Sequence, residues 1–350
     1  MPANKLLNRR GLLASGLAII GGGTALSPRI ARVGYSKGVF WHKGDHPKDP
    51  PETAGWTKYA RNPLLGDWFC TCFDPTVLRR GKRFEMWYSW RERRAIVYTS
   101  STDGTSWAKP QIVLAPSKAE ENVSRPSVIY RNNAYEMWYT ANHGNTKAAI
   151  FHASSVDGIS WNKTSKRPAL YPSLAWEQDS VMCPFILWDS SVGQYRMWYS
   201  AAAEKQWGEP KAIGYATSQD GLCWTKSSAP VFFPTGFGFD KQRTAACSVV
   251  PFQGWYYMFY IGFSTPQRAA IGVARSPDGI TNWQRHPKNP ILSAGNTYLA
   301  WDRDAIYKPS VIINGNSWLL WYNGRKGNIE RIGFASHEGL DLGFSEATLR

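Results

Sequence analysis

The chain has 350 residues, 43% of them hydrophobic, which provides enough apolar side chains for a packed core and excludes an intrinsically disordered protein. Aromatic residues make up 14% of the chain, beside 31 Gly and 22 Pro, and this mixture favours short strands joined by turns over long helices. The formal net charge of +15 indicates an anionic partner, but Lys and Arg are scattered without a basic helix or run, which argues against nucleic acid.

Residues 1–30 have the three-part layout of an export signal. Arg9 and Arg10 precede an apolar stretch at residues 12–20, and small residues follow it. The paired arginines resemble a twin-arginine signal and predict a periplasmic or extracellular protein, with an ordinary secretory signal or an uncleaved anchor as the alternatives. No other stretch approaches the ~20 apolar residues of a membrane span, so we expect no span once the signal is removed. We interpret residues 31–59 as an N-terminal extension and residues 60–350 as the globular domain.

A five-fold internal repeat follows, and it predicts the fold. A strand with the pattern Met-Trp-Tyr-Ser, or a close variant, occurs at residues 86–89, 137–140, 197–200, 258–261 and 320–323. After each copy come a strand that ends in a small residue and then a turn, which contains Asp-Gly in four repeats and Glu-Gly in the fifth. Asp-Gly is typical of a tight hairpin. Four repeats close with a Trp that we expect to cover the outer strand: Trp107, Trp161, Trp224 and Trp283.

Each repeat also begins with an innermost strand, so the chain is predicted to be all-β, a five-bladed β-propeller with four antiparallel strands per blade. Proline should stand at the start of this strand, where a hydrogen-bond donor can be spared. One register of the innermost strand varies between the repeats: Asp74, Arg125, Cys183, Ala246 and Lys308. These side chains should converge on the central funnel, where charges need partners or a ligand. The alternative is that Asp74 pairs with Arg125 or Lys308 to line a solvated channel.

Over about residues 60–345 this pattern resembles the five-bladed propeller glycosidases, a superfamily with glycoside hydrolase family 43, the β-fructosidases of family 32 and the mannoside phosphorylases of family 130. By this resemblance Asp74, which precedes Pro75, is the general base or nucleophile. These families commonly place a second Asp before the proline of blade two and a Glu near the start of blade three, where this chain has Arg125 and Met182-Cys183. The chain is therefore expected to be a divergent member whose general acid comes from another loop.

Blade three offers two carboxylates for that acid, Glu204 and Glu209, between its second and third strands. Glu209 is favoured, with Trp207 nearby to stack on a sugar; the alternative is a solvated loop carboxylate. Three acidic residues near the funnel could each be an acid, a sugar-hydroxyl acceptor or a loop cap, and the first is kept as a catalytic candidate: Asp179, Asp304 and Glu121. Three others follow an aromatic residue so regularly that we assign them to contacts between blades: Glu177, Asp240 and Asp302.

Several cations are expected to surround the funnel, and together they suit an acidic sugar, a sulfated sugar or inorganic phosphate. The predicted substrate-binding residues are Arg125, Lys308, Asp304, Glu204, Arg243, Arg91, His143, Trp90 and Trp207, with Arg325 on the same rim. The five Cys lack metal-site spacing, so neither a metal nor another cofactor is expected. The sequence thus predicts an exported, monomeric glycosidase that acts on a poly- or oligosaccharide. The alternatives are a non-catalytic glycan-binding propeller, a family 130-like phosphorylase and an interaction scaffold.

Overall fold

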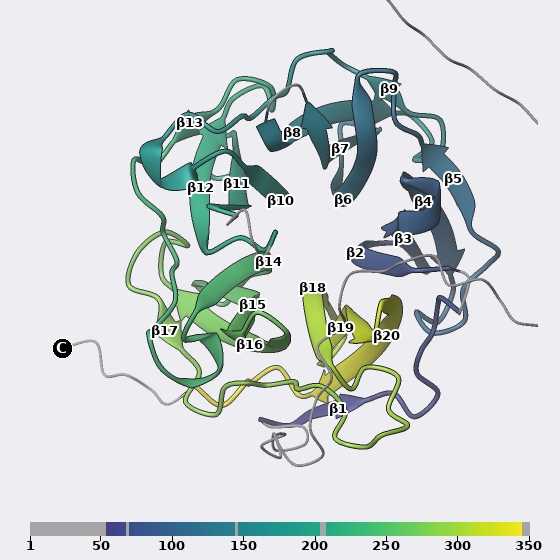
Figure 1. Cartoon of the computed structure of the whole chain (residues 1–350), viewed down its shortest axis with the longest axis vertical. Helices are drawn as coiled ribbons and strands as arrows, with labels where there is room; N and C mark the ends of the chain where they lie inside the picture. Colours follow the sequence, from purple (N-terminus) through teal and green to yellow (C-terminus); the bar gives the residue numbers. More distant parts are fainter. Residues whose placement is uncertain (1–53, 68–69, 144–145, 204–207, 345–350) are drawn as a thin grey trace, which may run out of the picture. The chain divides into compact units, whose positions relative to one another are not determined.

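The computed structural model describes residues 54–67, 70–143, 146–203 and 208–344, and within these residues five four-stranded antiparallel sheets follow one another around a ring (Figure 1). The predicted five-bladed β-propeller is confirmed. The proposed export signal lies outside the described residues. No helix within the described part of the chain is long and apolar enough to cross a membrane.

The first four blades are continuous in sequence, and each runs from an innermost to an outermost strand. Blade one contains β2 (Cys72–Arg80), β3 (Arg83–Trp90), β4 (Ala95–Ser101) and β5 (Gln111–Leu114). Blade two contains β6 (Glu120–Arg131), β7 (Ala134–His143), β8 (Thr146–Ser155) and β9 (Asn162–Lys163). Blade three contains β10 (Val181–Asp189), β11 (Gln194–Ala201), β12 (Ala212–Ser218) and β13 (Thr225–Lys226). Blade four contains β14 (Arg243–Phe252), β15 (Trp255–Thr265), β16 (Arg268–Ser276) and β17 (Gln284–Arg285). Short 3₁₀ turns stand at η1 (Arg91–Arg93), η2 (Ala175–Glu177) and η3 (Gly238–Asp240).

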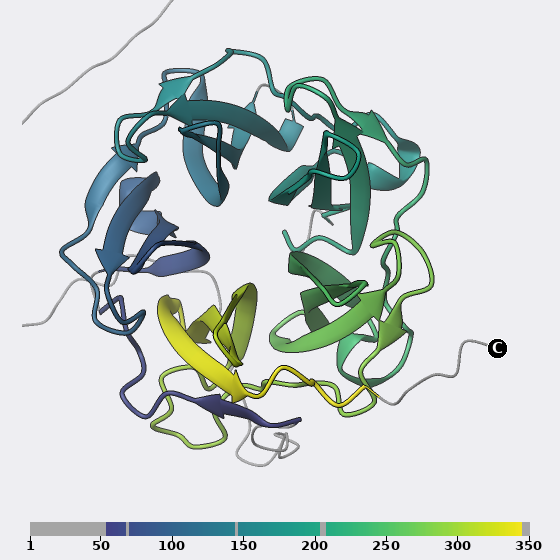
Figure 2. The ribbon, with the colours of Figure 1, turned by 180° about the vertical axis from the view of Figure 1, so that it is seen from behind.

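Blade five takes its outermost strand from the other end of the described chain. It contains β18 (Ala305–Asn314), β19 (Ser317–Lys326) and β20 (Ile329–Glu338), and β1 (Trp56–Lys58) pairs antiparallel with β20 (Figure 2). The Nζ atom of Lys58 in β1 lies 2.7 Å from Oδ2 of Asp302. The segment interpreted as an N-terminal extension therefore supplies the outer strand that links the first and last parts of the ring.

The repeated Trp of the second strand links neighbouring blades. Its Nε1 atom donates a hydrogen bond to the glycine carbonyl of the next blade's turn in four cases: Trp87 to Gly158 (2.9 Å), Trp138 to Gly221 (2.8 Å), Trp198 to Gly279 (2.8 Å) and Trp321 to Gly104 (2.9 Å). The Trp that closes a repeat packs edge-on against this ring, as Trp161 does on Trp87 of blade one at 6.3 Å. The closing Trp therefore contacts the aromatic ring of the neighbouring blade, and the expectation that it covers an outer strand stays a prediction.

The Asp-Gly turns are wider than the predicted tight hairpins. In blade two, β8 ends at Ser155 and β9 begins only at Asn162. The Asp157 carboxylate accepts backbone N–H bonds from Ile159 (2.8 Å) and Ser160 (2.7 Å), which lowers its pKa. Gly158 has a φ of +77°, and a Cβ atom on it would lie 3.0 Å from Trp87. The turn therefore requires glycine so that its carbonyl can reach the Trp of the preceding blade.

The acidic residues that recur before blades three, four and five form side-chain contacts within the blade that follows them. Their assignment to contacts between blades was therefore wrong. Glu177 accepts hydrogen bonds from Tyr199 (2.6 Å) in the second strand and from Lys226 (2.8 Å) in the fourth strand of blade three. Asp240 does the same in blade four with Tyr260 (3.0 Å) and Arg285 (2.8 Å). In blade five, Lys58 of β1 is the basic partner of Asp302. Each carboxylate thus anchors the loop that leads into a blade to that blade's outer strand.

Candidate active site

Every innermost strand has a β-bulge at the register that varies between blades. The pairing shifts at residues 73–76, 124–127, 182–185, 245–247 and 307–310. The residue at each bulge has a positive φ: Asp74 (55°), Arg125 (56°), Cys183 (52°), Ala246 (30°) and Lys308 (35°). A bulge interrupts the hydrogen-bond ladder and redirects the side chain. Proline follows the bulge residue in four blades and stands inside the strand, not at its start as predicted, because the ladder is already broken there.

The last position of the Met-Trp-Tyr-Ser pattern holds these bulges in place. Its side chain accepts the backbone N–H of the next blade's bulge residue: Ser89 from Arg125 (2.8 Å), Thr140 from Cys183 (3.0 Å), Ser200 from Ala246 (2.8 Å) and Asn323 from Asp74 (3.2 Å). Ile261 occupies this position in blade four and has no acceptor atom. The bulge is therefore fixed through its backbone, which leaves its side chain available for the funnel.

Asp74 and Glu330 lie close together because Asn323 contacts both residues. Asn323 Oδ1 accepts the Asp74 N–H, and Asn323 Nδ2 donates to Glu330 Oε2 at 3.2 Å. Asp74 is 7% exposed and its Oδ2 lies 3.3 Å from Nε of Arg125, while Arg91 reaches Glu330 Oε1 at 3.1 Å. Each carboxyl group is thus paired with its own guanidinium. For Asp74, pairing with Arg125 was one of the alternatives that the sequence left open. Glu330 was not predicted as a site residue, since it belongs to no repeated pattern.

Glu209 joins this group from the loop before β12. Burial raises the pKa of Glu209, Asp74 raises it further, and Arg125 opposes them. Burial likewise raises the pKa of Glu330 to about 7, against the opposing charge of Arg91. Asp74 and Glu209 thus act on each other electrostatically, and Glu330 is a third carboxyl group of this cluster. The catalytic pairing of Asp74 with Glu209 stays a prediction.

Further cations approach the same group. Arg243 is buried and donates to the Glu209 carbonyl at 3.1 Å, while Arg325 donates to the Gln267 carbonyl at 2.8 Å. Lys308 is 2% exposed, and its Nζ has no hydrogen-bond partner among the described residues. Burial raises the pKa of the Cys183 thiol to about 11, with Arg125 and Lys308 opposing, so the bulge residues of blades two, three and five act on one another.

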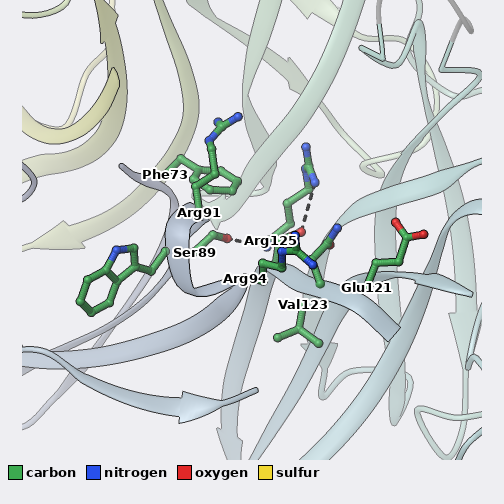
Figure 3. A pocket seen from close by; sticks show the side chains of 10 residues that line it. Phe73, Ser89, Arg91, Arg94, Glu121, Val123 and Arg125 are labelled. Carbon is green, nitrogen blue, oxygen red and sulfur yellow. Dashed lines mark hydrogen bonds between the residues drawn. The ribbon is translucent and has the colours of Figure 1, made fainter. Parts of the chain in front are cut away.

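A cavity of about 660 Å³ opens beside these carboxyl groups, between blades one and two (Figure 3). Blade one contributes Phe73, Ser89, Trp90, Arg91 and Arg94, and blade two contributes Glu121, Asn122, Val123, Ser124 and Arg125. The side chains of Arg91 and Arg125 extend in the same direction from the two blades, with the Phe73 ring beside Arg91 (Figure 3). Since these two arginines also pair with Glu330 and Asp74, the cavity adjoins the carboxyl group cluster directly.

Comparisons with known proteins agree with this fold. The model of the glycosyl hydrolases family 32 N-terminal domain matches residues 83–235, somewhat under half of the chain. A solved glycoside hydrolase has a TM-score of 0.66 at 17% identity, with 80% of this chain and 90% of that chain covered. The chain resembles the five-bladed propeller glycosidases. The predicted resemblance is thereby confirmed, at low identity.

Two further structures show how broad this likeness is. A thermostable family-43 glycoside hydrolase has a TM-score of 0.62 at 20% identity, covering 78% of this chain and 91% of its own. The β-1,2-mannobiose phosphorylase from Listeria innocua has a TM-score of 0.65 at 13% identity, covering 81% and 96%. No curated protein matches the chain. At such identities the likeness to these propellers establishes the fold, and the chemistry has to be argued from the site.

The other predicted site residues are placed as follows. Asp304 binds Arg303 (3.1 Å) and the backbone N–H of Gly327 (2.6 Å), which fits the loop-capping alternative. Asp179 is half-buried just past η2, and its role stays a prediction. Trp90 lines the cavity, as does the exposed Glu121. Glu204, Trp207 and the side chain of His143 lie outside the described residues.

Within the described residues, no group of three or more His, Cys, Asp or Glu side chains is arranged to hold a metal ion. The described site consists of the carboxyl groups of Asp74, Glu209 and Glu330. Five cations surround them: Arg91, Arg125, Arg243, Lys308 and Arg325. With carboxyl groups in differing environments, such a site is equipped for acid–base chemistry on an oxygen-rich ligand.

Proposed function

We propose that the protein is a glycosidase that hydrolyses a bond of a poly- or oligosaccharide in the propeller funnel. The observation that supports this most directly is the placement of Asp74 and Glu330 around Asn323. One carboxylate is paired with Arg125, and the other is buried with a pKa raised to about 7. Two carboxyl groups in different environments are what glycoside hydrolysis requires, one as base or nucleophile and one as acid.

In this mechanism Asp74 is the base or nucleophile and Glu330 is the acid. Glu330 protonates the leaving oxygen as the oxocarbenium-like transition state forms. Asp74 either activates water or attacks the anomeric carbon, which gives inversion or retention respectively. Glu209, the acid favoured on sequence grounds, is the second candidate because burial raises its pKa in the same direction.

The test is hydrolysis of a glycan panel by the full chain and its variants Asp74→Asn, Glu330→Gln and Glu209→Gln. Asp74→Asn and the variant of the true acid should each lose about 10²- to 10⁴-fold in kcat/KM. The acid variant should keep more activity on aryl glycosides with good leaving groups, because these need less protonation. Glu338→Gln, an exposed carboxylate at the end of β20 outside the site, is the matched control and should keep full activity. Full activity of Asp74→Asn would refute the mechanism.

A second candidate function, phosphorolysis, is favoured by the five cations around three carboxyl groups, because phosphate as the attacking group would need paired cationic contacts. The same panel with and without inorganic phosphate separates the two reactions. Sugar phosphate formed only with phosphate would select the phosphorylase, and binding without turnover would select a non-catalytic glycan-binding propeller.

We also propose that the chain is exported by its twin-arginine-like segment, which the pair Arg9-Arg10 before an apolar stretch supports. Replacing both arginines by lysine should leave the protein in the cytoplasm, as measured by cell fractionation. Unchanged export would favour an ordinary secretory signal.

A further inference from the structure

The cavity between blades one and two carries more positive charge than its own carboxylate balances. Arg91, Arg94 and Arg125 line it, and Glu121 is the acidic residue in its wall. Arg94 is exposed and makes no ion pair within the described part of the chain. The charge therefore exceeds what pairing with the neighbouring carboxyl groups requires.

Arg91 and Arg125 each contact a carboxyl group of the cluster and still face the cavity. Arg91 uses Nη2 for Glu330 and its side chain is 54% exposed; Arg125 uses Nε for Asp74 and is 30% exposed. Arg125 Nη1 also donates to Ser124 Oγ at 3.1 Å. A guanidinium has five N–H donors in a fixed fork, so both arginines keep N–H donors for a ligand. The two side chains extend in the same direction (Figure 3), and this arrangement suits a ligand with more than one acceptor oxygen.

Aromatic groups complete the cavity. The Phe73 ring lies beside both guanidiniums, with Arg91 Cζ at 4.7 Å and Arg125 Cζ at 6.0 Å from its centroid. Stacking of this kind fixes the orientation of the cations. Trp90 lines the wall, and its buried Nε1 has no hydrogen-bond partner among the described residues. Because this nitrogen is buried, Trp90 offers a ligand its apolar ring surface and not its N–H donor.

We propose that this cavity binds the oxyanion of an acidic sugar, a carboxylate or a sulfate ester, on a residue next to the cleaved bond. Its volume of about 660 Å³ lies in the range of roughly 300–1,000 Å³ that is typical of small-ligand sites. The cavity is placed beside Asp74 and Glu330 because Arg125 and Arg91, which line it, also pair with these two carboxyl groups. That the bound sugar is part of a substrate rests on the proposed function. The inference then narrows that substrate to an anionic glycan.

The test measures binding by calorimetry, with the full chain and monosaccharides that contain no bond to cleave. The probes are glucuronic acid, a sulfated glucose, neutral glucose and inorganic phosphate. One or both acidic sugars should bind at least about tenfold more tightly than glucose, and this advantage should shrink as ionic strength rises. Preference for the carboxylate or for the sulfate identifies the anionic group.

Arg94→Met should weaken binding of the acidic sugar about tenfold, and Arg94→Lys should restore part of it by retaining the charge without the fork. Arg167→Met, which removes an exposed arginine from the loop between β9 and η2, is the matched control and should leave this binding unchanged. An unchanged thermal midpoint checks that each variant is folded.

Equal binding of acidic and neutral sugars, or equal effects of Arg94→Met and Arg167→Met, would overturn the inference. Phosphate that binds as tightly as the acidic sugars would also overturn it in favour of a free-oxyanion site. Selective binding of acidic sugars without hydrolysis of any glycan would support the cavity assignment and refute the proposed function. Hydrolysis of neutral glycans without such selectivity would do the reverse.

Discussion

Glu330 provides the sharpest test of the proposed site, because its protonation is tied to the stability of the fold. Burial raises the pKa of Glu330 to about 7, and Asp74 and Glu209 act in the same direction, while Arg91 and Arg325 oppose them. In the unfolded chain the same carboxyl group has its ordinary pKa of 4.5. Between these two pH values the native state keeps a proton that the unfolded state has lost, so the free energy of unfolding falls as pH rises.

The size of this effect follows from the two pKa values. One pKa unit corresponds to about 1.4 kcal/mol, so a rise from 4.5 to about 7 makes this contribution to stability about 3 kcal/mol at low pH. It is fully present below pH about 4.5 and is lost as pH rises through about 7. The acid role has a matching signature, since only protonated Glu330 can donate and kcat/KM should fall above about pH 7.

The assay is denaturant unfolding of the wild type and Glu330→Gln at about pH 5 and about pH 8. Glutamine keeps the size of the side chain and an acceptor for Asn323 Nδ2 but does not titrate. Over this range the two pKa values predict that the variant loses about 2.5 kcal/mol less stability than the wild type. Glu209 titrates in both proteins, so their difference isolates Glu330. Glu338→Gln is the exposed control and should follow the wild type.

A parallel loss of stability in the wild type and Glu330→Gln would refute this reasoning. It would mean that the native fold does not hold a proton on Glu330, and the acid role would pass to Glu209. The same measurement on Glu209→Gln would then have to show the missing difference.

Two further predictions concern the bulges. Lys308→Met should raise the free energy of unfolding by about 1–3 kcal/mol, because it removes a buried amino group without a hydrogen-bond partner among the described residues. The same change should weaken substrate binding. A lower thermal midpoint would contradict this prediction. Thr140→Val should lower the free energy of unfolding by about 1–3 kcal/mol, measured in urea, because the Cys183 N–H loses its acceptor at 3.0 Å. Thr102→Val at an exposed turn is the control for Thr140→Val, and a similar loss there would contradict the hydrogen-bond explanation.

The repeated contacts are the part of the fold that the sequence predicts well. The Trp of each second strand meets the turn of the next blade, as Trp87 meets Gly158, and the same pair of residue types therefore recurs at a regular spacing. A contact made several times leaves a periodic pattern that one sequence reveals. The loop width of the Asp-Gly turns was misjudged, because Asp157 forms the same local bonds in a wider bend as it would in a tight hairpin.

The features that occur once could not be predicted in this way. The outer strand of blade five depends on pairing between β1 and β20, and the supporting contact joins Lys58 to Asp302 across most of the chain. Glu330 is a single acidic residue near the start of β20, and only closure of the ring brings it beside Asp74. The place of Asp74 at the funnel was predicted because it stands at a register that can be compared across blades, whereas its proposed role rests on the resemblance to the propeller glycosidases.

The bulges explain how this propeller can differ from its relatives at the site without losing the fold. Thr140 holds the Cys183 bulge, and Ser89 the Arg125 bulge, by the backbone N–H and not by the side chain. A substitution at the bulge therefore leaves the hydrogen bonds between blades intact and changes only what faces the funnel. Arg125 stands where the resembling families commonly carry a carboxylate, and its positive charge beside Asp74 is what the proposed anionic ligand would require. The bulge side chains are thus positions at which the site can change while the hydrogen bonds between blades remain.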